Sequence, residues 1–448
     1  MRICTLRDLV AEGSTAGAES NAEAARLKES TGFAAVIDGA VGRYEQPPAE
    51  GVLIETEWAE VWLGPTDWAE AFESVEPGTR HDDAREQIWE QLVAIALDQH
   101  DPEVPEALVR RSLRDNERLR SAFQRAWPLL DPAGLVADLW TNPDFLRASA
   151  PWLDAEQVRL LQRADGRAWT VSDLPLLDAA RHRIGDPEAV GRERRRAAAL
   201  ASDRERMSRV VDDLIAADDS DLKLMSMLRE QDAQNSLIDD TSAPEAAIDP
   251  LEGPFAHVVV DEAQELTGAE WQMLLRRCPS KSFTVVGDRA QARRGFAEPW
   301  QERLGRIGLD RVEVASLTVN YRTPAEVMAV AEPVIRAAIP DANVPSSIRS
   351  SGVPVERGSV SELDGIVGSW LETDDDGTAC IVGGPDVASF RVSTDRVRVL
   401  TPELAKGLEF DLVVLVDPES LGDGIEGAVD RYVAMTRTTR RLVILTPE

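Results

Sequence analysis

Several short segments in the second half of the chain place acidic, amide or arginine side chains directly after apolar runs. The first is Asp261-Glu262, which follows the run His257–Val260. An apolar β-branched run of this kind predicts a buried parallel strand that presents both carboxylates at its carboxyl end, where open α/β sheets bind ligands. In a nucleotide site Asp261 would hold Mg²⁺, directly or through water. Glu262 would orient or deprotonate the attacking water.

A second apolar run, Phe283–Val286, ends at Gly287-Asp288, with Gln291 three residues further on. A neutral amide at this point would contact a γ-phosphate and the attacking water at once, which would let the sheet distinguish ATP from ADP. The simpler interpretation is a turn that Asp288 caps.

The third segment is Tyr321-Arg322, which lies between an apolar run and a predicted helix. Thr323 as N-cap, Pro324 at the first helical position and Glu326 at the third predict a capping box, and so a strand-to-helix junction just after Arg322. A guanidinium at a strand end suits a γ-phosphate, and Tyr321 would stack on a base.

Two further segments complete the set. Lys406-Gly407-Leu408-Glu409-Phe410 leads into the apolar run Leu412–Val416. Arg437 follows Arg431–Thr436, near the end of a predicted helix, from which it would reach across a cleft as an arginine finger.

The elements around these segments alternate between strands and helices, which is typical of a doubly wound α/β fold. Residues 81–235 are predicted to be helical, and Val52–Leu63 to be a strand or hairpin. The charge-dense stretch Arg192–Arg206 predicts a solvated helix face or, less simply, a nucleic-acid patch. The strands predicted in the second half are Val258–Val260, Phe283–Val286, Val312–Val319, Ala379–Val382, Val397–Leu400, Leu412–Val416 and Leu442–Leu445.

Composition narrows the choice of partners. The 448 residues carry a net charge of −31. This charge either serves solubility or favours binding to a basic protein surface. It does not favour nucleic acid, because proteins that bind nucleic acid usually carry a basic surface patch. Cys4, Cys278 and Cys380 show no metal-ligand spacing and fit a reducing cytoplasm. No apolar run is long enough for a membrane span, so we expect a cytoplasmic protein with no membrane partner.

Taken in order, the segments resemble the motifs of superfamily 1 helicases of the UvrD/Rep type. The segments His257–Gln264, Val286–Gln291, Asn320–Arg322, Lys406–Phe410 and Val433–Arg437 are similar to their motifs II to VI. The resemblance implies two RecA-like P-loop NTPase-type domains, the first incomplete, with a large helical insertion. The implied boundaries are 1–80 and 246–308 for the first domain, 81–245 for the insertion, and 309–448 for the second domain.

The same resemblance implies ATP and Mg²⁺ as cofactors and assigns the site residues. Glu262, Gln291, Arg322 and Arg437 would be catalytic, and Asp261 would bind the metal. Nucleotide contacts would come from Tyr321, Asp288, Gly407 and Glu409, with Tyr321 and Glu409 on the rim of the cleft where Glu262, Arg322 and Arg437 converge.

A narrower resemblance is to HelD-type proteins, helicase-like ATPases of bacteria that bind RNA polymerase. It rests on Ala168–Asp178 and on Trp271–Gly287, with Arg276-Arg277-Cys278-Pro279-Ser280 at the centre of the second segment. It implies RNA polymerase as a partner.

The chain departs from these families at the phosphate-binding loop, because the sequence contains no Gly-Lys pair. Family members carry this loop before the segment that resembles Met1 to Glu12. The chain would then be a truncated reading frame or half of a split protein, completed by an upstream segment or a separate chain. The alternatives are a non-catalytic acidic protein that docks on RNA polymerase, or a fragment of a DNA repair helicase. An incomplete first sheet would also expose an unpaired edge.

Overall fold

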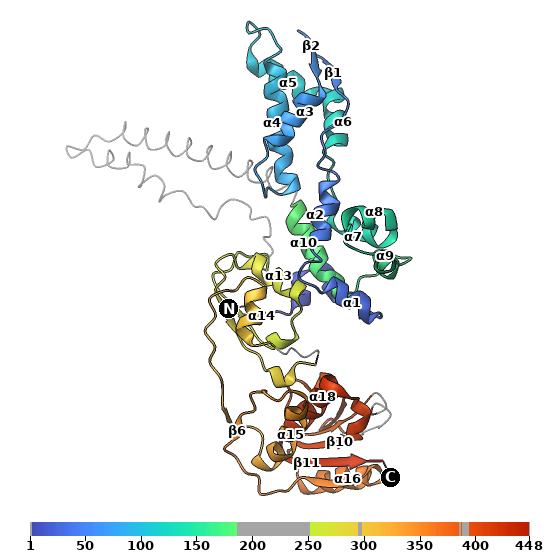
Figure 1. The fold of residues 1–448 in the computed structure, drawn as a ribbon, viewed down its shortest axis with the longest axis vertical. Coiled ribbons are helices and arrows are strands. Elements are labelled where there is room, and N and C mark those ends of the chain that lie inside the picture. Colours follow the sequence, from blue (N-terminus) through green and yellow to red (C-terminus); the bar gives the residue numbers. More distant parts are fainter. Residues whose placement is uncertain (1, 186–250, 294–297, 385–386, 388–393, 448) are drawn as a thin grey trace, which may run out of the picture. The chain divides into compact units, whose positions relative to one another are not determined.

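A computed structural model describes residues 2–185, 251–293, 298–384, 387 and 394–447 (Figure 1). The chain divides into two compact units. Unit 1 comprises Met1–Pro254 and Gly268–Arg277, and unit 2 comprises Phe255–Thr267 and Cys278–Glu448. The segments that carry Asp261 and Gln291 therefore belong to the same unit as those that carry Arg322 and Arg437.

In the described residues 2–185, 251–254 and 268–277, unit 1 is helical apart from one hairpin, three short 3₁₀ turns and the connecting segments (Figure 1). Its helices are α1 (Ala22–Lys28), α2 (Ala35–Gly42), α3 (Pro65–Glu73), α4 (His81–Leu97), α5 (Glu106–Asp115), α6 (Glu117–Ala126), α7 (Pro132–Thr141), α8 (Pro143–Ser149), α9 (Ala155–Leu161), α10 (Leu174–Ile184) and α13 (Gly268–Arg277). The predicted helical block is thus confirmed over 81–184. Its remainder, with Arg192–Arg206, lies outside the described residues.

Local sequence explains where many of these helices begin. Asn116, Asp131, Asn142 and Asp154 are the N-caps of α6, α7, α8 and α9, and each side chain accepts hydrogen bonds from backbone N–H groups of the first turn. These bonds satisfy donors that have no partner within a helix, so the boundaries follow from the sequence.

The hairpin pairs β1 (Val52–Glu55) with β2 (Glu60–Leu63) antiparallel, as the sequence predicts. Its inward face packs on α3–α6 and forms one apolar cluster, while α2, α7–α10 and α13 enclose another. Unit 1 therefore has two cores.

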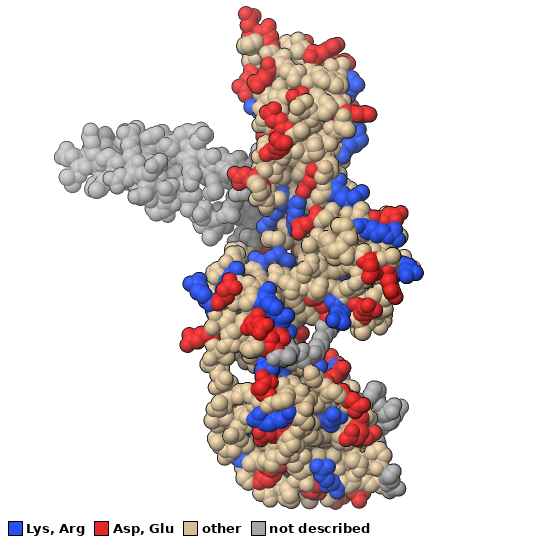
Figure 2. Space-filling view, in the orientation of Figure 1, with Lys and Arg blue, Asp and Glu red and all other residues tan. Residues whose placement is uncertain are grey.

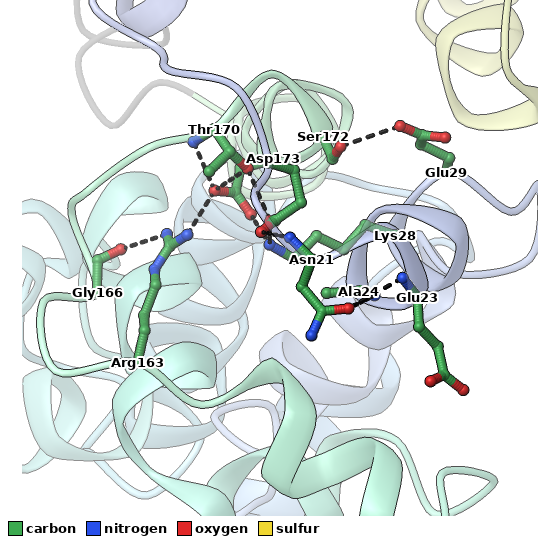
Figure 3. A network of polar contacts seen from close by, with 11 residues as sticks. Asn21, Glu23, Ala24, Lys28, Glu29, Arg163, Gly166, Thr170, Ser172 and Asp173 are labelled. Atoms are coloured by element: carbon green, nitrogen blue, oxygen red, sulfur yellow. Dashed lines mark hydrogen bonds and ion pairs between the residues drawn. The ribbon is translucent and has the colours of Figure 1, made fainter. Parts of the chain in front are cut away.

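A buried ion network joins α1 to the segment between α9 and α10 (Figure 3). Asp173, which is 0 % exposed, pairs with Lys28 at 3.0 Å and with Arg163 at 2.8 Å. It also accepts hydrogen bonds from the N–H and hydroxyl of Thr170. Burial by itself would raise the pKa of Asp173, but the charges of Lys28 and Arg163 outweigh it and lower that pKa. Asp173 is therefore ionised at neutral pH.

Unit 2 contains a five-stranded sheet in the order β7-β11-β10-β8-β9, with every neighbouring pair parallel (Figure 1). The strands are β7 (Glu356–Ser359), β8 (Ala379–Val382), β9 (Val397–Leu400), β10 (Phe410–Val416) and β11 (Thr438–Thr446). Central strand β10 sends Val413 and Leu415 into the cluster with α15 (Ala325–Ala338) and α18 (Gly424–Thr436), and Leu412 and Val414 into the cluster with α16 (Leu363–Thr373). Burial on both faces explains its unbroken apolar sequence.

Two smaller parallel pairs complete the strands that the structure describes in unit 2. β3 (Val258–Val260) pairs with β4 (Phe283–Val285), and β5 (Val319–Asn320) pairs with β6 (Ser346–Ser347). Val259 on β3 is 63 % exposed, so one face of the β3–β4 pair is open to solvent. The parallel pairing confirms a mixed α/β architecture, and a complete pair of RecA-like domains stays a prediction.

Two predictions near Arg322 are wrong. Of the predicted strand Val312–Val319, only Val319 lies in a strand, β5, and Val314 and Leu317 are exposed rather than packed in a core. The capping box does not form either. Glu326 turns away to accept hydrogen bonds from Ser350 and from nearby backbone N–H groups, which lower its pKa to about 2.

The Asn320 side chain instead holds the turn before α15, where it accepts hydrogen bonds from the N–H groups of Arg322 and Thr323, at 2.9 and 3.0 Å. The helix begins at Ala325 with Pro324 as its N-cap, one residue later than the sequence predicts. Within the described part of the chain, no helix has the length and hydrophobicity to cross a membrane.

We expect Asp173→Asn to destabilise unit 1 by about 3 kcal/mol at pH 7, because it leaves the buried Lys28 and Arg163 charges without a carboxylate. The folded-state pKa of Asp173 is lowered, so its contribution is present above the unfolded value of about 3.9 and lost as pH falls through the folded value. Urea unfolding at pH 7 and at pH 3 measures this. Asp115→Asn, at an exposed carboxylate of α5, is the matched control. Equal stability of the two variants at pH 7 would contradict the prediction.

Candidate active site

The carboxyl end of β3 presents Asp261 and Glu262 to solvent. Glu262 adopts a left-handed backbone conformation, with φ 51°, which non-glycine residues rarely occupy. Asp261 Oδ1 accepts the N–H of Glu262 at 2.9 Å and supports this turn. Strained backbone of this kind is concentrated at functional sites.

Gln264 links Glu262 to the end of β4. It is 4 % exposed, its Nε2 donates to Glu262 Oε2 at 2.5 Å, and its Oε1 accepts the N–H of Asp288 at 3.0 Å. Gly287 must be a glycine here, since a Cβ would lie 3.0 Å from Gln264 Oε1 and 2.7 Å from the Trp300 ring. Sequence reasoning did not assign a role to Gln264. The sequence feature that could have indicated this role is an amide side chain two residues after Glu262, at the end of a predicted strand.

Asp288 and Gln291 continue this chain of contacts. Asp288 accepts the N–H of Ala290 and the Nε2 group of Gln291, both at 2.8 Å, so it does cap a turn. Burial raises the pKa of Asp288 despite these bonds. The carbonyl oxygen of Gln291 accepts a hydrogen bond from Lys406 at 3.0 Å, and Lys406 also pairs with Glu265. Lys406 was quoted in the sequence pattern but given no role there.

Arg437 closes the chain from the end of α18. It is 5 % exposed, its Nε donates to the carbonyl of Val433 at 3.2 Å, and its Nη2 donates to Gln291 Oε1 at 3.3 Å. Burial lowers the pKa of Arg437, and the nearby charge of Arg322 lowers it further, while Glu262 opposes both effects. Arg437 therefore lies within electrostatic reach of both Glu262 and Arg322.

Arg322 is held on the other side of Arg437. It pairs with Glu409 at 2.7 Å, and both side chains are partly exposed. The hydroxyl of the neighbouring Thr323 donates to the carbonyl of Thr436 at 3.3 Å, which fixes the start of α15 against the end of α18. This contact of a side-chain hydroxyl with a backbone carbonyl joins the residue after Arg322 to the residue before Arg437.

The structure thus joins six of the nine predicted site residues through contacts or short-range electrostatics: Glu262, Asp288, Gln291, Arg322, Glu409 and Arg437. Among the described residues, the other three form no hydrogen bond or ion pair with these side chains, and Asp261 bonds only the backbone N–H of Glu262. Tyr321 is 73 % exposed, and Gly407 supplies a turn with φ +72°.

A metal ion would find few protein ligands here. The described residues contain no group of three or more His, Cys, Asp or Glu side chains suited to a metal. Mg²⁺ commonly binds through one or two carboxylates together with substrate phosphates, so the exposed Asp261 carboxylate fits that mode and no all-protein cage.

Comparison with known proteins gives partial structural similarity. The sequence matches no protein-family model, and no curated protein sequence is significantly similar to it. The C-terminal domain of a possible DNA helicase from Lactobacillus plantarum WCFS1 is similar at 16 % identity and a TM-score of 0.22, over 29 % of this chain and 88 % of that one. Arterivirus nonstructural protein 10, a helicase, is similar at 19 % identity and a TM-score of 0.26, over 42 % of this chain and 38 % of that one. The same viral helicase in complex with DNA gives 20 % identity and a TM-score of 0.25, over 42 % and 39 % of the two chains.

We expect Gln264→Glu to destabilise unit 2 at pH 7.5 by about 2 kcal/mol, because it places a carboxylate against Glu262 and leaves an acceptor unsatisfied. Repulsion raises the folded-state pKa of one carboxyl above its unfolded value. The protonated form is therefore favoured at low pH, and the loss should shrink at pH 5. Urea unfolding at both pH values measures this, with Gln301→Glu, on the exposed side of α14 (Trp300–Arg306), as control. A loss of equal size at both pH values would argue against repulsion.

Proposed function

We propose that unit 2 forms the acidic and arginine-bearing part of a helicase-type ATP hydrolysis site. The observation that carries this proposal is the buried Arg437 guanidinium, which donates to Gln291 Oε1 at 3.3 Å and whose pKa responds to the charges of Arg322 and Glu262. A buried guanidinium, with a second and partly exposed one contributing charge, gains from a bound polyanion whose charge compensates both. A terminal phosphate has the required charge and forked geometry.

The side chains fit the roles that such a site needs. Glu262 would accept the proton of the attacking water, and Gln291, between Arg437 and the end of β4, would orient that water. Arg437 and Arg322 would stabilise charge on the transferring phosphoryl group. Mg²⁺, held by Asp261 and the phosphates, would supply charge neutralisation, and Tyr321 and Glu409 would contact base and ribose.

The remaining requirement is a cradle for the β- and γ-phosphates. The sequence has no G-x-x-x-x-G-K-[ST] segment, so we propose that this loop comes from an additional segment or a separate chain. The complete protein would couple ATP hydrolysis to remodelling of RNA polymerase or nucleic acid.

The net charge of −31 favours a second candidate, a non-catalytic acidic protein that docks on RNA polymerase. A DNA repair helicase is the third, and salt-dependent DNA binding by the chain would distinguish it.

We expect the 448-residue chain to bind ATP weakly and hydrolyse it at the background rate, because arginine and carboxylate groups act on a phosphate that is already positioned. Release of inorganic phosphate with ATP and Mg²⁺ measures hydrolysis. Robust turnover would refute this expectation and would mean that unrecognised residues hold the phosphates.

Adding a strand–G-x-x-x-x-G-K-[ST]–helix segment ahead of Met1 should restore turnover. In that protein, Glu262→Gln should abolish hydrolysis and spare binding of a fluorescent ATP analogue, because the amide keeps the shape but not the base. Glu302→Gln, an exposed change on α14, should leave both unchanged. If Glu262→Gln kept full turnover, Glu262 would not be the base.

A further inference from the structure

Unit 1 contains a cavity of about 250 Å³ between α2, the segment just before α4, α10 and α13. Its walls include Ile37, Asp38, Arg80, His182, Arg183 and Arg276. Figure 2 shows basic side chains gathered on this part of unit 1, where α10 and α13 lie. Three arginines around one small cavity are unusual in a chain whose net charge is −31.

Of these arginines, Arg80 has the weakest ion pairing in the described part of the chain. Its stem packs across Gly185, whose hypothetical Cβ would lie 3.2 Å from Arg80 Cβ and 3.3 Å from Cδ. Gly185 has φ +93° and ends α10, so the fold places Arg80 at this helix terminus. The ion pair of Arg80 with Asp83 measures 3.9 Å and is solvent-exposed, so it holds the guanidinium only weakly.

Arg276 carries charge that its own partner does not fully balance. Its Nε and Nη2 both donate to Asp178 Oδ2, at 3.1 and 2.6 Å, which leaves Nη1 for another acceptor. Arg277 pairs with the other oxygen of the same carboxylate at 2.5 Å. Two guanidinium groups against one carboxylate leave a net positive charge at this wall.

The pKa of His182 responds to that positive charge. Burial lowers the pKa of His182, and Arg80 and Arg276 lower it further, whereas Asp178 opposes them. The third arginine of the lining, Arg183, is compensated, because it pairs with Glu45 at 2.6 Å and lies 3.4 Å from Asp38. The uncompensated positive charge in the lining therefore comes from Arg80 and Arg276.

We propose that this cavity binds a small multivalent oxyanion of the phosphate class, with Arg80 and Arg276 as its charged ligands and His182 as a neutral hydrogen-bond partner. The volume lies below the ~300–1,000 Å³ of sites for drug-sized ligands, so it suits phosphate, pyrophosphate or one backbone phosphate of a nucleic acid. The overall negative charge repels anions at long range, and binding thus depends on direct contacts with arginine. This site lies within unit 1 and does not depend on the function proposed for unit 2.

Isothermal titration of the full chain with inorganic phosphate, pyrophosphate and a single-stranded oligonucleotide tests the proposal. We expect saturable pyrophosphate binding that Arg80→Ala weakens about tenfold or more, the loss typical of a hydrogen bond to a charged group. Arg80→Lys should bind with intermediate affinity, since it keeps the charge and loses the planar fork. Arg111→Ala, at an exposed arginine of α5, should bind like the unchanged chain.

The outcomes distinguish a free phosphate compound from a nucleic-acid phosphate, and the unit 1 cavity from the unit 2 site. Arg80-dependent binding of pyrophosphate assigns a free phosphate compound, and Arg80-dependent binding of the oligonucleotide alone assigns a backbone phosphate. Absence of saturable binding for all three ligands overturns the proposal. Binding that survives Arg80→Ala but disappears with Arg437→Ala also overturns it, because the anion would then occupy the unit 2 site.

Discussion

The charge of Arg437 is almost removed from water, and much of the polar structure of unit 2 follows from that constraint. A buried guanidinium is unfavourable unless other groups solvate it. The backbone carbonyl of Val433 and the side-chain oxygen of Gln291 accept its hydrogen bonds, and the charge of Glu262 favours its protonated form. Arg322 works against them, so the site is only partly compensated by the protein itself. That imbalance is what an anionic ligand would remove.

The contacts between Glu262 and Arg437 form a continuous route through Gln264, Asp288 and Gln291. The side-chain amides of Gln264 and Gln291 each use their oxygen and their nitrogen for different partners, so both ends of each amide are hydrogen-bonded.

Unit 1 handles buried charge differently. Asp173 is matched by Lys28 and Arg163, and Asp178 by Arg276 and Arg277. Both acids come from the segment Ala168–Asp178, and Arg276 and Arg277 come from Trp271–Gly287. In unit 1 these residues join distant parts of the chain, which is a structural role. In the neighbouring cavity, by contrast, Arg80 and Arg276 keep positive charge that their own partners do not fully balance.

Elements set by local pattern could be predicted from the sequence, and contacts between elements could not. The runs that became β3, β8, β9 and β10 are apolar because both faces or one face of each strand is buried, and the Asx caps mark helix starts directly. Val312–Val319 also carries several apolar residues, yet only Val319 lies in a strand, and Val314 and Leu317 stay exposed. The sequence by itself also identified Glu262, Gln291, Arg322 and Arg437 as candidates, since each follows an apolar run or ends a helix. Only the tertiary structure decided that Thr323 would bond Thr436 rather than cap its own helix, and so bring two arginines together. Periodicity is a property of neighbouring residues, whereas charge compensation depends on which distant segments meet.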